Sequence, residues 1–337
     1  MISTQNPVVI FGAGAIGCYL GAQWADTGTP VTLHGRDRLL AHARTGFEIE
    51  SGPRLSSADL SGNPGITTDP LCLAKAGLIV VTVKATALDA AISQIREHST
   101  PQTPVLCLLN GIAPARRLET ALPEWRISAG MVPFNVVWSS ETTLRRSSVG
   151  EVVLERTAAT EQLVSCLGTN APQVLLSDDI RAVQYGKLLL NLNNPVNALS
   201  EKSLYHQLRE RPYRLVYAAA LQEALDVYEG AQINHAKSGP LPARRIVQML
   251  RAPDWLFNTV ALRLQKLDPQ SQTSMAQDLA AGKPTEIDTI NGEIVDLATA
   301  TGQIAPVNAR LVELIRNASA GGQKTFSATE LYHAVLT

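Results

Sequence analysis

The sequence predicts an α/β protein in which an N-terminal Rossmann-type, doubly wound sheet precedes an all-α C-terminal domain. A short apolar run, Val8–Phe11, leads into a glycine-rich turn. Continuous apolar runs then alternate with helical periodicity as far as about residue 177, as is typical of parallel strands buried on both faces. Beyond residue 178 helical periodicity dominates, and we therefore place the domain boundary there.

The first βαβ unit consists of the strand Val8–Phe11, the glycine turn, a helical pattern over Cys18–Ala25 and a second strand, Val31–His34. Five later apolar runs predict further strands: Leu78–Val83, Val105–Leu109, Ile127–Val132, Glu151–Leu154 and Gln173–Leu176. The segment 139–150, rich in Ser, Thr and Arg, is expected to form a loop or hairpin.

In the second half, helical periodicity predicts helices over 180–200, 211–229, 241–250, 254–265, 271–281, 285–301 and 306–318. Gly282 and Gly302 are expected to end helices, and Pro284 and Pro306 to begin them. We therefore expect a nucleotide-binding domain over 1–178, a helical domain over 179–325 and a loosely held tail over 326–337, with a short helix near 328–335.

Composition indicates an ordinary globular protein. The 337 residues are 45% hydrophobic and 18% charged, and the net charge of −1 predicts neither a nucleic-acid partner nor an anionic membrane surface. The N-terminal sequence predicts no signal peptide, and no apolar run is long enough to span a membrane. The four cysteines show no metal-ligand spacing, so we expect no metal and interpret them as reduced, buried thiols of a cytoplasmic protein.

The glycine turn has the spacing of a dinucleotide-binding loop and lies between a strand and a helix, as such a loop must. Glycines allow the tight turn and the close approach of a pyrophosphate, while the helix N-terminus supplies N–H groups. A glycine-rich turn without a ligand is the alternative. The cofactor-binding residues predicted here are Gly12, Ala13, Gly14, Ala15, Ile16 and Gly17.

The end of the second strand predicts which dinucleotide is bound. NAD-binding units usually carry Asp or Glu there, whereas this chain has His34, Gly35 and Arg36, with Arg38 close behind. A guanidinium suits a 2′-phosphate, so Arg36 favours NADP. The alternative is that Arg36 is a solvated arginine beside Asp37.

Two more polar residues follow strands of the predicted sheet. Lys84 follows the strand 78–83, and Asn110 follows the strand 105–109. Because the carboxyl ends of parallel strands line the ligand crevice, we expect both side chains at the nicotinamide or ribose end of the cofactor. For Asn110 the alternative is a simple turn, since Asn-Gly is a common turn pair.

Lys187, Asn191 and Asn194 fall at i, i+4 and i+7 of the predicted helix 180–200, among leucines. An ammonium and amides in apolar surroundings are costly unless they find partners, and a ligand could supply these. We expect Pro195 to kink this helix near Asn191. A surface lysine beside asparagines that cap a broken helix is the alternative.

Farther along, Ser274 and Asp278 lie one helical turn apart, and Glu286 lies near a predicted helix N-terminus, where a carboxylate is stabilised in any case.

Over nearly its whole length, the chain resembles the ketopantoate reductase family. The motifs that carry the resemblance are the GAGAIG turn, Lys84, Asn110-Gly111, Lys187-x-x-x-Asn191, and the string Ser274-Met-x-Gln-Asp278 followed by Pro284-Thr-Glu286-Ile-Asp-x-Ile-Asn-Gly292. The last string is the most specific of these motifs.

The resemblance implies a helical domain of the 6-phosphogluconate-dehydrogenase type and the NADPH-dependent reduction of ketopantoate to pantoate, in pantothenate and coenzyme A synthesis. It implies that Lys187 is the general acid and that Glu286 binds the substrate hydroxyl and orients the lysine. It also implies substrate contacts from Asn110, Asn191 and Ser274, with a further amide from Asn194 or Asn197, between which the sequence does not choose.

Two alternatives to this function stay open: a related keto acid, β-hydroxyacid or imine reductase, and a catalytically silent NADP-binding sensor. The partner expected is a small-molecule keto acid, and a homodimer is left open.

Overall fold

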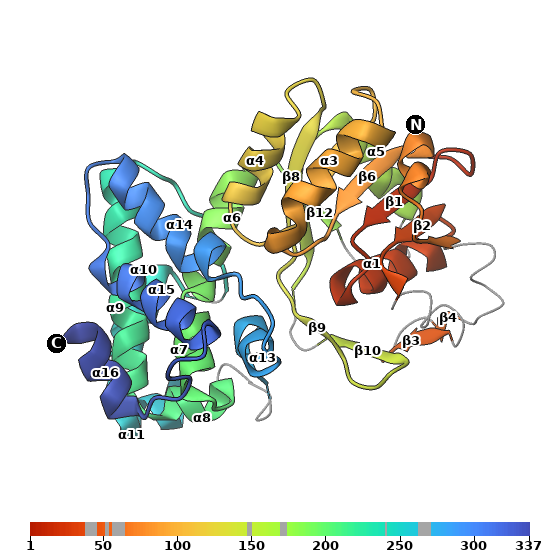
Figure 1. The fold of residues 1–337 in the computed structure, drawn as a ribbon. Coiled ribbons are helices and arrows are strands. Elements are labelled where there is room, and N and C mark those ends of the chain that lie inside the picture. The colour runs from red at the N-terminus through yellow and green to blue at the C-terminus, as the bar shows by residue number, and fades with distance from the viewer. Residues whose placement is uncertain are drawn as a thin grey trace. The chain divides into compact units, whose positions relative to one another are not determined.

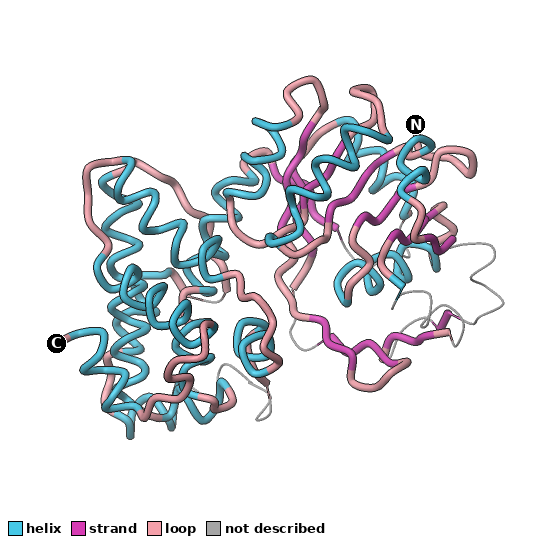
Figure 2. Tube along the Cα trace, in the orientation of Figure 1, coloured by secondary structure: helices cyan, strands magenta, loops and turns pink. Residues whose placement is uncertain are grey.

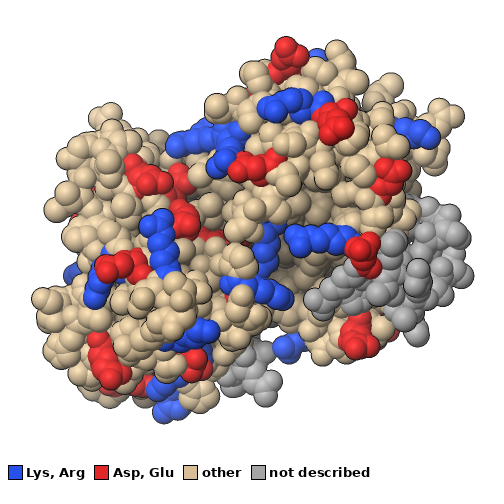
Figure 3. Space-filling view, viewed as in Figure 1, with Lys and Arg blue, Asp and Glu red and all other residues tan. Residues whose placement is uncertain are grey.

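The structure is a computed structural model that describes residues 1–37, 46–50, 54–55, 65–146, 150–168, 174–239, 241–261 and 271–337. The chain divides into two compact units, Met1–Ile180 and Arg181–Thr337 (Figure 1). On the face shown in Figure 3, acidic and basic side chains are interspersed, in keeping with the net charge of −1. Within the part of the chain that the structure describes, no helix combines the length and apolar character that crossing a bilayer requires.

An eight-stranded sheet forms the centre of the first unit, in the order β12-β11-β8-β7-β6-β1-β2-β5. Its strands are β1 (Val8–Phe11), β2 (Val31–His34), β5 (Gly65–Thr67), β6 (Leu78–Val81), β7 (Val105–Cys107), β8 (Ile127–Met131), β11 (Val152–Glu155) and β12 (Val174–Ser177). In the order of the sheet, the six neighbouring strands β8, β7, β6, β1, β2 and β5 are parallel, and β11 pairs with β8 antiparallel. The predicted doubly wound Rossmann sheet is therefore confirmed.

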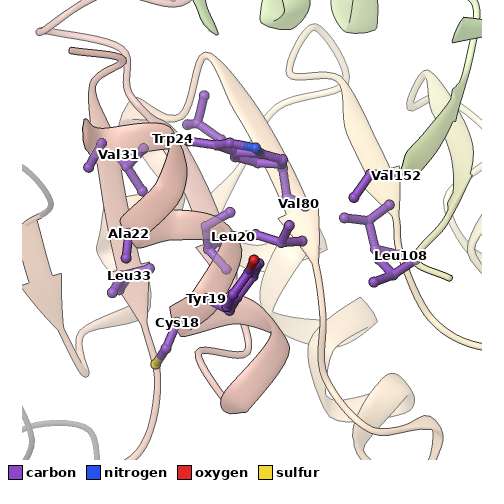
Figure 4. Close-up of a cluster of buried hydrophobic side chains, with 14 of the residues drawn as sticks. Cys18, Tyr19, Leu20, Ala22, Trp24, Val31, Leu33, Val80, Leu108 and Val152 are labelled. Carbon is purple, nitrogen blue, oxygen red and sulfur yellow. The ribbon is translucent and has the colours of Figure 1, made fainter. Parts of the chain in front are cut away.

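The central strands β1, β6 and β7 are buried on both faces of the sheet, which explains their continuous apolar runs in the sequence. Val8 and Ile10 of β1 pack with Leu20 and Trp24 of helix α1 (Ala15–Asp26), in the cluster drawn in Figure 4. Val9 points to the opposite face and is equally inaccessible to solvent. The described part of this unit contains three further α-helices: α3 (Leu88–His98), α4 (Ala113–Ala121) and α5 (Ala158–Leu167).

A second, four-stranded sheet was not predicted. It has the order β4-β3-β10-β9 and contains β3 (Phe47–Ile49), β4 (Arg54–Leu55), β9 (Val136–Trp138) and β10 (Thr143–Arg146), visible in Figure 2. The hairpin alternative for 139–150 is confirmed in part, because β9 and β10 pair antiparallel. The strands of this second sheet have two to four residues and, apart from β9, mix apolar with charged or polar residues, so they lack the continuous apolar runs that marked β1, β6 and β7.

The second unit is helical, as predicted. The helices among its described residues are α6 (Ile180–Asn191), α7 (Asn194–Ser200), α8 (Leu204–Arg209), α9 (Arg211–Gly230), α10 (Ala243–Leu250), α11 (Asp254–Leu256), a π-helical segment (Phe257–Ala261), α13 (Ser274–Ala280), α14 (Ile287–Ala300), α15 (Pro306–Ser319) and α16 (Ala328–Leu336). Helix α8 was not predicted. The predicted helix 254–265 corresponds to α11 and the π-helical segment, and its predicted end lies outside the described residues. The helix predicted to begin at 271 begins at Ser274.

The expected helix 180–200 is interrupted by Leu192 and Asn193, so that Pro195 lies in the first turn of a new helix, α7. Proline is well tolerated there, because the first N–H groups of a helix have no partner within it. The kink expected near Asn191 is a complete break between two helices, so Lys187 and Asn194 do not lie on one continuous helix face as the spacing suggested.

Gly282 and Gly302 end α13 and α14 in the left-handed region, with φ of +63° and +69°. The N–H of Lys283 donates to the Asp278 carbonyl at 2.8 Å, as in a Schellman motif. Pro306 begins α15 as expected. Pro284 does not begin α14, which starts only at Ile287.

The C-terminal segment is not loosely held as expected. Helix α16 packs against α9, and Leu331 of α16 is fully buried. The Tyr213 hydroxyl of α9 donates to the Phe326 carbonyl at 2.6 Å. The expectation for the cysteines also needs correction: all four are free thiols, but only Cys18 and Cys107 are buried, while Cys72 and Cys166 are partly exposed.

Candidate active site

The three glycines of the turn after β1 have different neighbours. Gly12 has φ of +109°, and a Cβ there would lie 2.6 Å from the Val83 backbone nitrogen. A Cβ on Gly17 would lie 2.8 Å from the Gly12 carbonyl oxygen. By contrast, the nearest atom to a Cβ on Gly14 would be 4.0 Å away, and Gly14 is exposed. The fold itself needs Gly12 and Gly17, whereas Gly14 keeps the approach to the turn open.

Gly14 also marks the N-terminus of α1, and this terminus suits an anion. Gly14 caps the helix without a side-chain hydrogen bond, and the first helical turn contains no acidic residue. The first backbone bond of the helix runs from the Cys18 N–H to the Gly14 carbonyl, at 2.8 Å. The N–H groups of the three intervening residues therefore have no acceptor within the helix and carry its positive dipole.

The end of β2 carries no acidic side chain. The His34 ring stacks on Phe11 with centroids 4.5 Å apart, and burial lowers the pKa of His34. The His34 carbonyl accepts the N–H groups of Gly12 and Ala13, at 3.0 and 2.8 Å, so β2 and the glycine turn are directly joined. Arg36 follows and is exposed to solvent. Arg38 lies outside the described residues.

Lys84 and Asn110 lie at the same edge of the sheet as the glycine turn, because β1, β6 and β7 are adjacent and parallel. Lys84 is exposed and precedes a short 3₁₀ turn, Ala85–Ala87. Asn110 is partly buried, and Gly111 follows with φ of +84°. The first unit thus brings the predicted cofactor residues to one edge.

In the second unit, Lys187 and Glu286 influence each other electrostatically. Lys187 lies on α6 beside the buried Leu188 and Leu189, and Glu286 is the N-cap residue of α14. Burial lowers the pKa of Lys187 to about 8, and the Glu286 carboxylate opposes this shift. Desolvation outweighs the attraction of the carboxylate, which leaves an ammonium that can lose its proton near neutral pH.

Three neutral polar side chains of the same unit are available to a ligand. Asn191 ends α6, Asn194 begins α7 and Ser274 begins α13. None of these side chains hydrogen-bonds to another residue that the structure describes. Asn191 and Ser274 are partly exposed, and Asn194 is 8% exposed. Buried polar groups normally have partners, so uncommitted donors of this kind suit a bound ligand.

Asn197 differs from these residues in its exposure and in its hydrogen bonds. Its side chain is inaccessible to solvent. Its Oδ1 atom accepts from the backbone N–H of Thr273 at 3.0 Å and from the Thr273 hydroxyl at 3.1 Å, and its Nδ2 atom donates to the Lys202 carbonyl at 2.9 Å. An inaccessible amide that already makes three hydrogen bonds has little left to offer a ligand, so Asn194 is the better candidate of the two.

Sequence reasoning overlooked two residues that shape this region. Thr273 caps α13 immediately before Ser274. A Cβ on Gly186, the residue before Lys187, would lie 2.1 Å from the Ala236 carbonyl oxygen. Only glycine therefore allows the backbone at Ala236 to lie this close to α6. A glycine inside an otherwise apolar helical pattern was the available signal for Gly186.

A Rossmann-type unit followed by a helical unit that presents a lysine, a glutamate and uncommitted amides is typical of dinucleotide-dependent reductases. Two family models match this chain: "Ketopantoate reductase PanE/ApbA" over residues 8–158 and "Ketopantoate reductase PanE/ApbA C terminal" over residues 179–319. The chain belongs to the ketopantoate reductase family.

Similar proteins agree with this assignment. A 2-dehydropantoate 2-reductase of Mycobacterium tuberculosis is 29% identical over 322 residues, covering 93% of this chain and 98% of the relative. A PanE/ApbA family ketopantoate reductase from Ralstonia eutropha JMP134 has a similar structure, with a TM-score of 0.79, 27% identity and coverage of 94% and 99%. D-mandelate dehydrogenase, solved with NADH and anilino(oxo)acetate, shares the fold at a TM-score of 0.76, 21% identity and the same coverage.

Proposed function

We propose that this protein reduces 2-dehydropantoate (ketopantoate) to pantoate with NADPH, in the synthesis of pantothenate and coenzyme A, and that Lys187 is the general acid. One observation carries the proposal. An ammonium whose pKa is about 8 occurs in the same unit as three neutral side chains that have no partner among the described residues. Such a set can bind a keto acid without net charge repulsion and can protonate its carbonyl oxygen.

The first unit would hold the cofactor. The free N–H groups at the start of α1 suit a pyrophosphate, and the open position at Gly14 leaves room for it. Arg36 would bind a 2′-phosphate, since a guanidinium matches phosphate in charge and geometry. Lys84 and Asn110 would contact the ribose or nicotinamide end, and Asn110 the substrate as well. When bound, the reduced nicotinamide supplies the hydride that adds to the keto carbon.

The second unit would supply the groups that act on the substrate. As hydride arrives, negative charge develops on the carbonyl oxygen, and the Lys187 ammonium stabilises this charge and then gives up its proton. Asn191, Asn194 and Ser274 would donate to the substrate carboxylate. Glu286 would accept from the substrate hydroxyl and keep Lys187 protonated, which fits its effect on the lysine pKa.

The test is NADPH oxidation by the purified protein with ketopantoate and with a panel of other 2-keto acids, including arylglyoxylates, and of imines. Highest kcat/KM with ketopantoate would support the proposal. A clear preference for another substrate would assign a related reductase on this scaffold. Tight NADPH binding without turnover of any substrate would favour a cofactor sensor. Sedimentation of the same preparation tests whether the protein forms a homodimer.

A further inference from the structure

We infer that Asn197 is a positioning residue: it fixes the start of α13, and with it Ser274, against the α6–α7 segment that carries Asn191 and Asn194. The inference rests on the proposed function in one respect only, the assignment of Ser274 to substrate binding. It replaces the role that the sequence suggested for Asn197, direct contact with substrate, by an indirect one.

The amide of Asn197 makes three hydrogen bonds, to two different segments. Its oxygen accepts both the backbone N–H and the hydroxyl of Thr273, at 3.0 and 3.1 Å. Its nitrogen donates to the Lys202 carbonyl, just beyond α7, at 2.9 Å. Asn197 is inaccessible to solvent and Thr273 is 6% exposed, so these bonds are shielded from bulk water. Truncation of Asn197 would leave buried donors of Thr273 without an acceptor.

Thr273 transmits this restraint to the next residue, Ser274. The Thr273 hydroxyl donates to Asn197 and also accepts the Ala276 N–H at 3.2 Å, as the N-cap of α13. One hydroxyl therefore joins the helix to its cap and the cap to α7. A change in the position of Thr273 must move Ser274, which is the first residue of α13.

Helix α13 needs such a restraint because it has only seven residues, Ser274–Ala280. A helix of this length is not stable alone, and tertiary contacts decide whether and where it forms. Besides the Asn197 bonds, the Ser271 carbonyl accepts the Leu204 N–H at 2.8 Å, and Met275 and Leu279 are buried. The Asn197 bonds are the ones that act at the N-terminus, where Ser274 lies.

Asn193 provides a matched control on the same stretch of chain. It is also a buried asparagine, and its amide exchanges two hydrogen bonds with the buried Gln207, at 3.0 and 3.2 Å. These bonds join the start of α7 to α8 and do not involve α13. Replacing Asn193 by alanine therefore removes a similar buried amide while leaving the Thr273 cap intact.

The experiment compares Asn197→Ala with Asn193→Ala by hydrogen exchange and by kinetics. We expect Asn197→Ala to speed amide exchange in residues 274–281 at least tenfold and to raise KM for the keto acid at least tenfold, with the Kd for NADPH unchanged. Asn193→Ala should do neither, even where it lowers Tm equally. The double variant, Asn197→Ala with Thr273→Val, should raise KM by less than the product of the fold-changes of the two single variants, because both residues belong to one hydrogen-bond network.

Equal exchange in α13 for both alanine variants would overturn the inference. Faster exchange in Asn197→Ala with an unchanged KM would overturn its link to Ser274. If the wild-type protein does not reduce ketopantoate, the proposed function fails, but the exchange measurement still decides whether Asn197 holds α13. KM is then measured with whichever keto acid the wild type does reduce.

Discussion

The Glu286 carboxylate at the start of α14 raises the pKa of the Lys187 ammonium on α6, against the larger effect of burial, which lowers it to about 8. The two residues are distant in sequence, and the helical unit brings them within electrostatic reach. A lysine in this state is mostly protonated at pH 7 yet able to release its proton, as a general acid requires.

The first prediction concerns the alkaline limb of the pH–rate profile. If protonated Lys187 is required, kcat/KM for keto acid reduction should fall as pH rises through about 8. Glu286→Gln removes the charge that favours the ammonium, so the limb should move to lower pH and substrate binding should weaken. Asp288→Asn is the control, because Asp288 is exposed and paired with Arg316. A limb that stays in place in Glu286→Gln would contradict the coupling.

The second prediction concerns the proton itself. Lys187→Ala should lower kcat by about 10²–10⁴, the usual range for a lost general acid, while NADPH still binds. Lys187→Arg keeps the positive charge but cannot release a proton, and it should therefore remain nearly as inactive as Lys187→Ala. Steady-state kinetics and cofactor titration measure both. Wild-type turnover in Lys187→Arg would assign Lys187 a purely electrostatic role.

The third prediction separates cofactor binding from folding at the glycine turn. Because a Cβ on Gly14 would meet no atom closer than 4.0 Å, Gly14→Ala should leave Tm unchanged and weaken NADPH binding at least tenfold, roughly 1.4 kcal/mol. Gly17→Ala should lower Tm, since its Cβ would lie 2.8 Å from the Gly12 carbonyl oxygen. Thermal denaturation and cofactor titration test the pair. Normal NADPH affinity in Gly14→Ala would exclude the turn as the pyrophosphate site.

The fourth prediction concerns the choice between NADPH and NADH. Losing a charged, bidentate contact should cost roughly 1.5–3 kcal/mol. Arg36→Ala should therefore raise KM for NADPH about tenfold or more and leave KM for NADH nearly unchanged. Arg117→Ala, another exposed arginine of the same unit that pairs with Asp89, is the control. Equal losses for both cofactors would exclude Arg36 as the 2′-phosphate ligand.

The fifth prediction concerns the stability of the helical unit. Arg214 is fully buried on α9, donates to the carbonyls of three residues and pairs with Asp254 at 2.8 Å. Breaking a buried charge network typically costs about 3–5 kcal/mol, so Arg214→Met should lower Tm of this unit by roughly 6–20 °C.

Arg211 provides the comparison for Arg214. It lies one turn earlier on the same helix, is exposed, and donates to a single carbonyl, that of Arg251. Arg211→Met should therefore change Tm by no more than a few degrees, because surface substitutions usually cost about 0.5 kcal/mol or less. Similar Tm losses in the two variants would show that the buried network is not what stabilises this region.

Local sequence patterns were sufficient for the main elements of the fold. The strands Val8–Phe11 and Val31–His34 have the predicted bounds, because continuous apolar runs and flanking glycines are local signals of a buried parallel sheet. The stops at Gly282 and Gly302 and the break near Pro195 also follow from the backbone preferences of single residues. The small second sheet and α8 were missed, because their residues lack a comparable local signal and distant partners stabilise them.

The tertiary structure decided the role of each polar residue. From the sequence, Asn194 and Asn197 were equivalent amides flanking the same short stretch of chain. Only the fold brings Thr273 to Asn197, where the amide oxygen of Asn197 accepts two hydrogen bonds from it. The side chain of Asn194 has no such partner among the described residues. Likewise, the sequence by itself determined that a lysine lies among leucines, but the pKa of Lys187 depends on Glu286 and on burial by distant segments. Burial, electrostatic coupling and hydrogen bonding of this kind depend on residues that are far apart in the chain. Periodicity and motif spacing therefore cannot predict them.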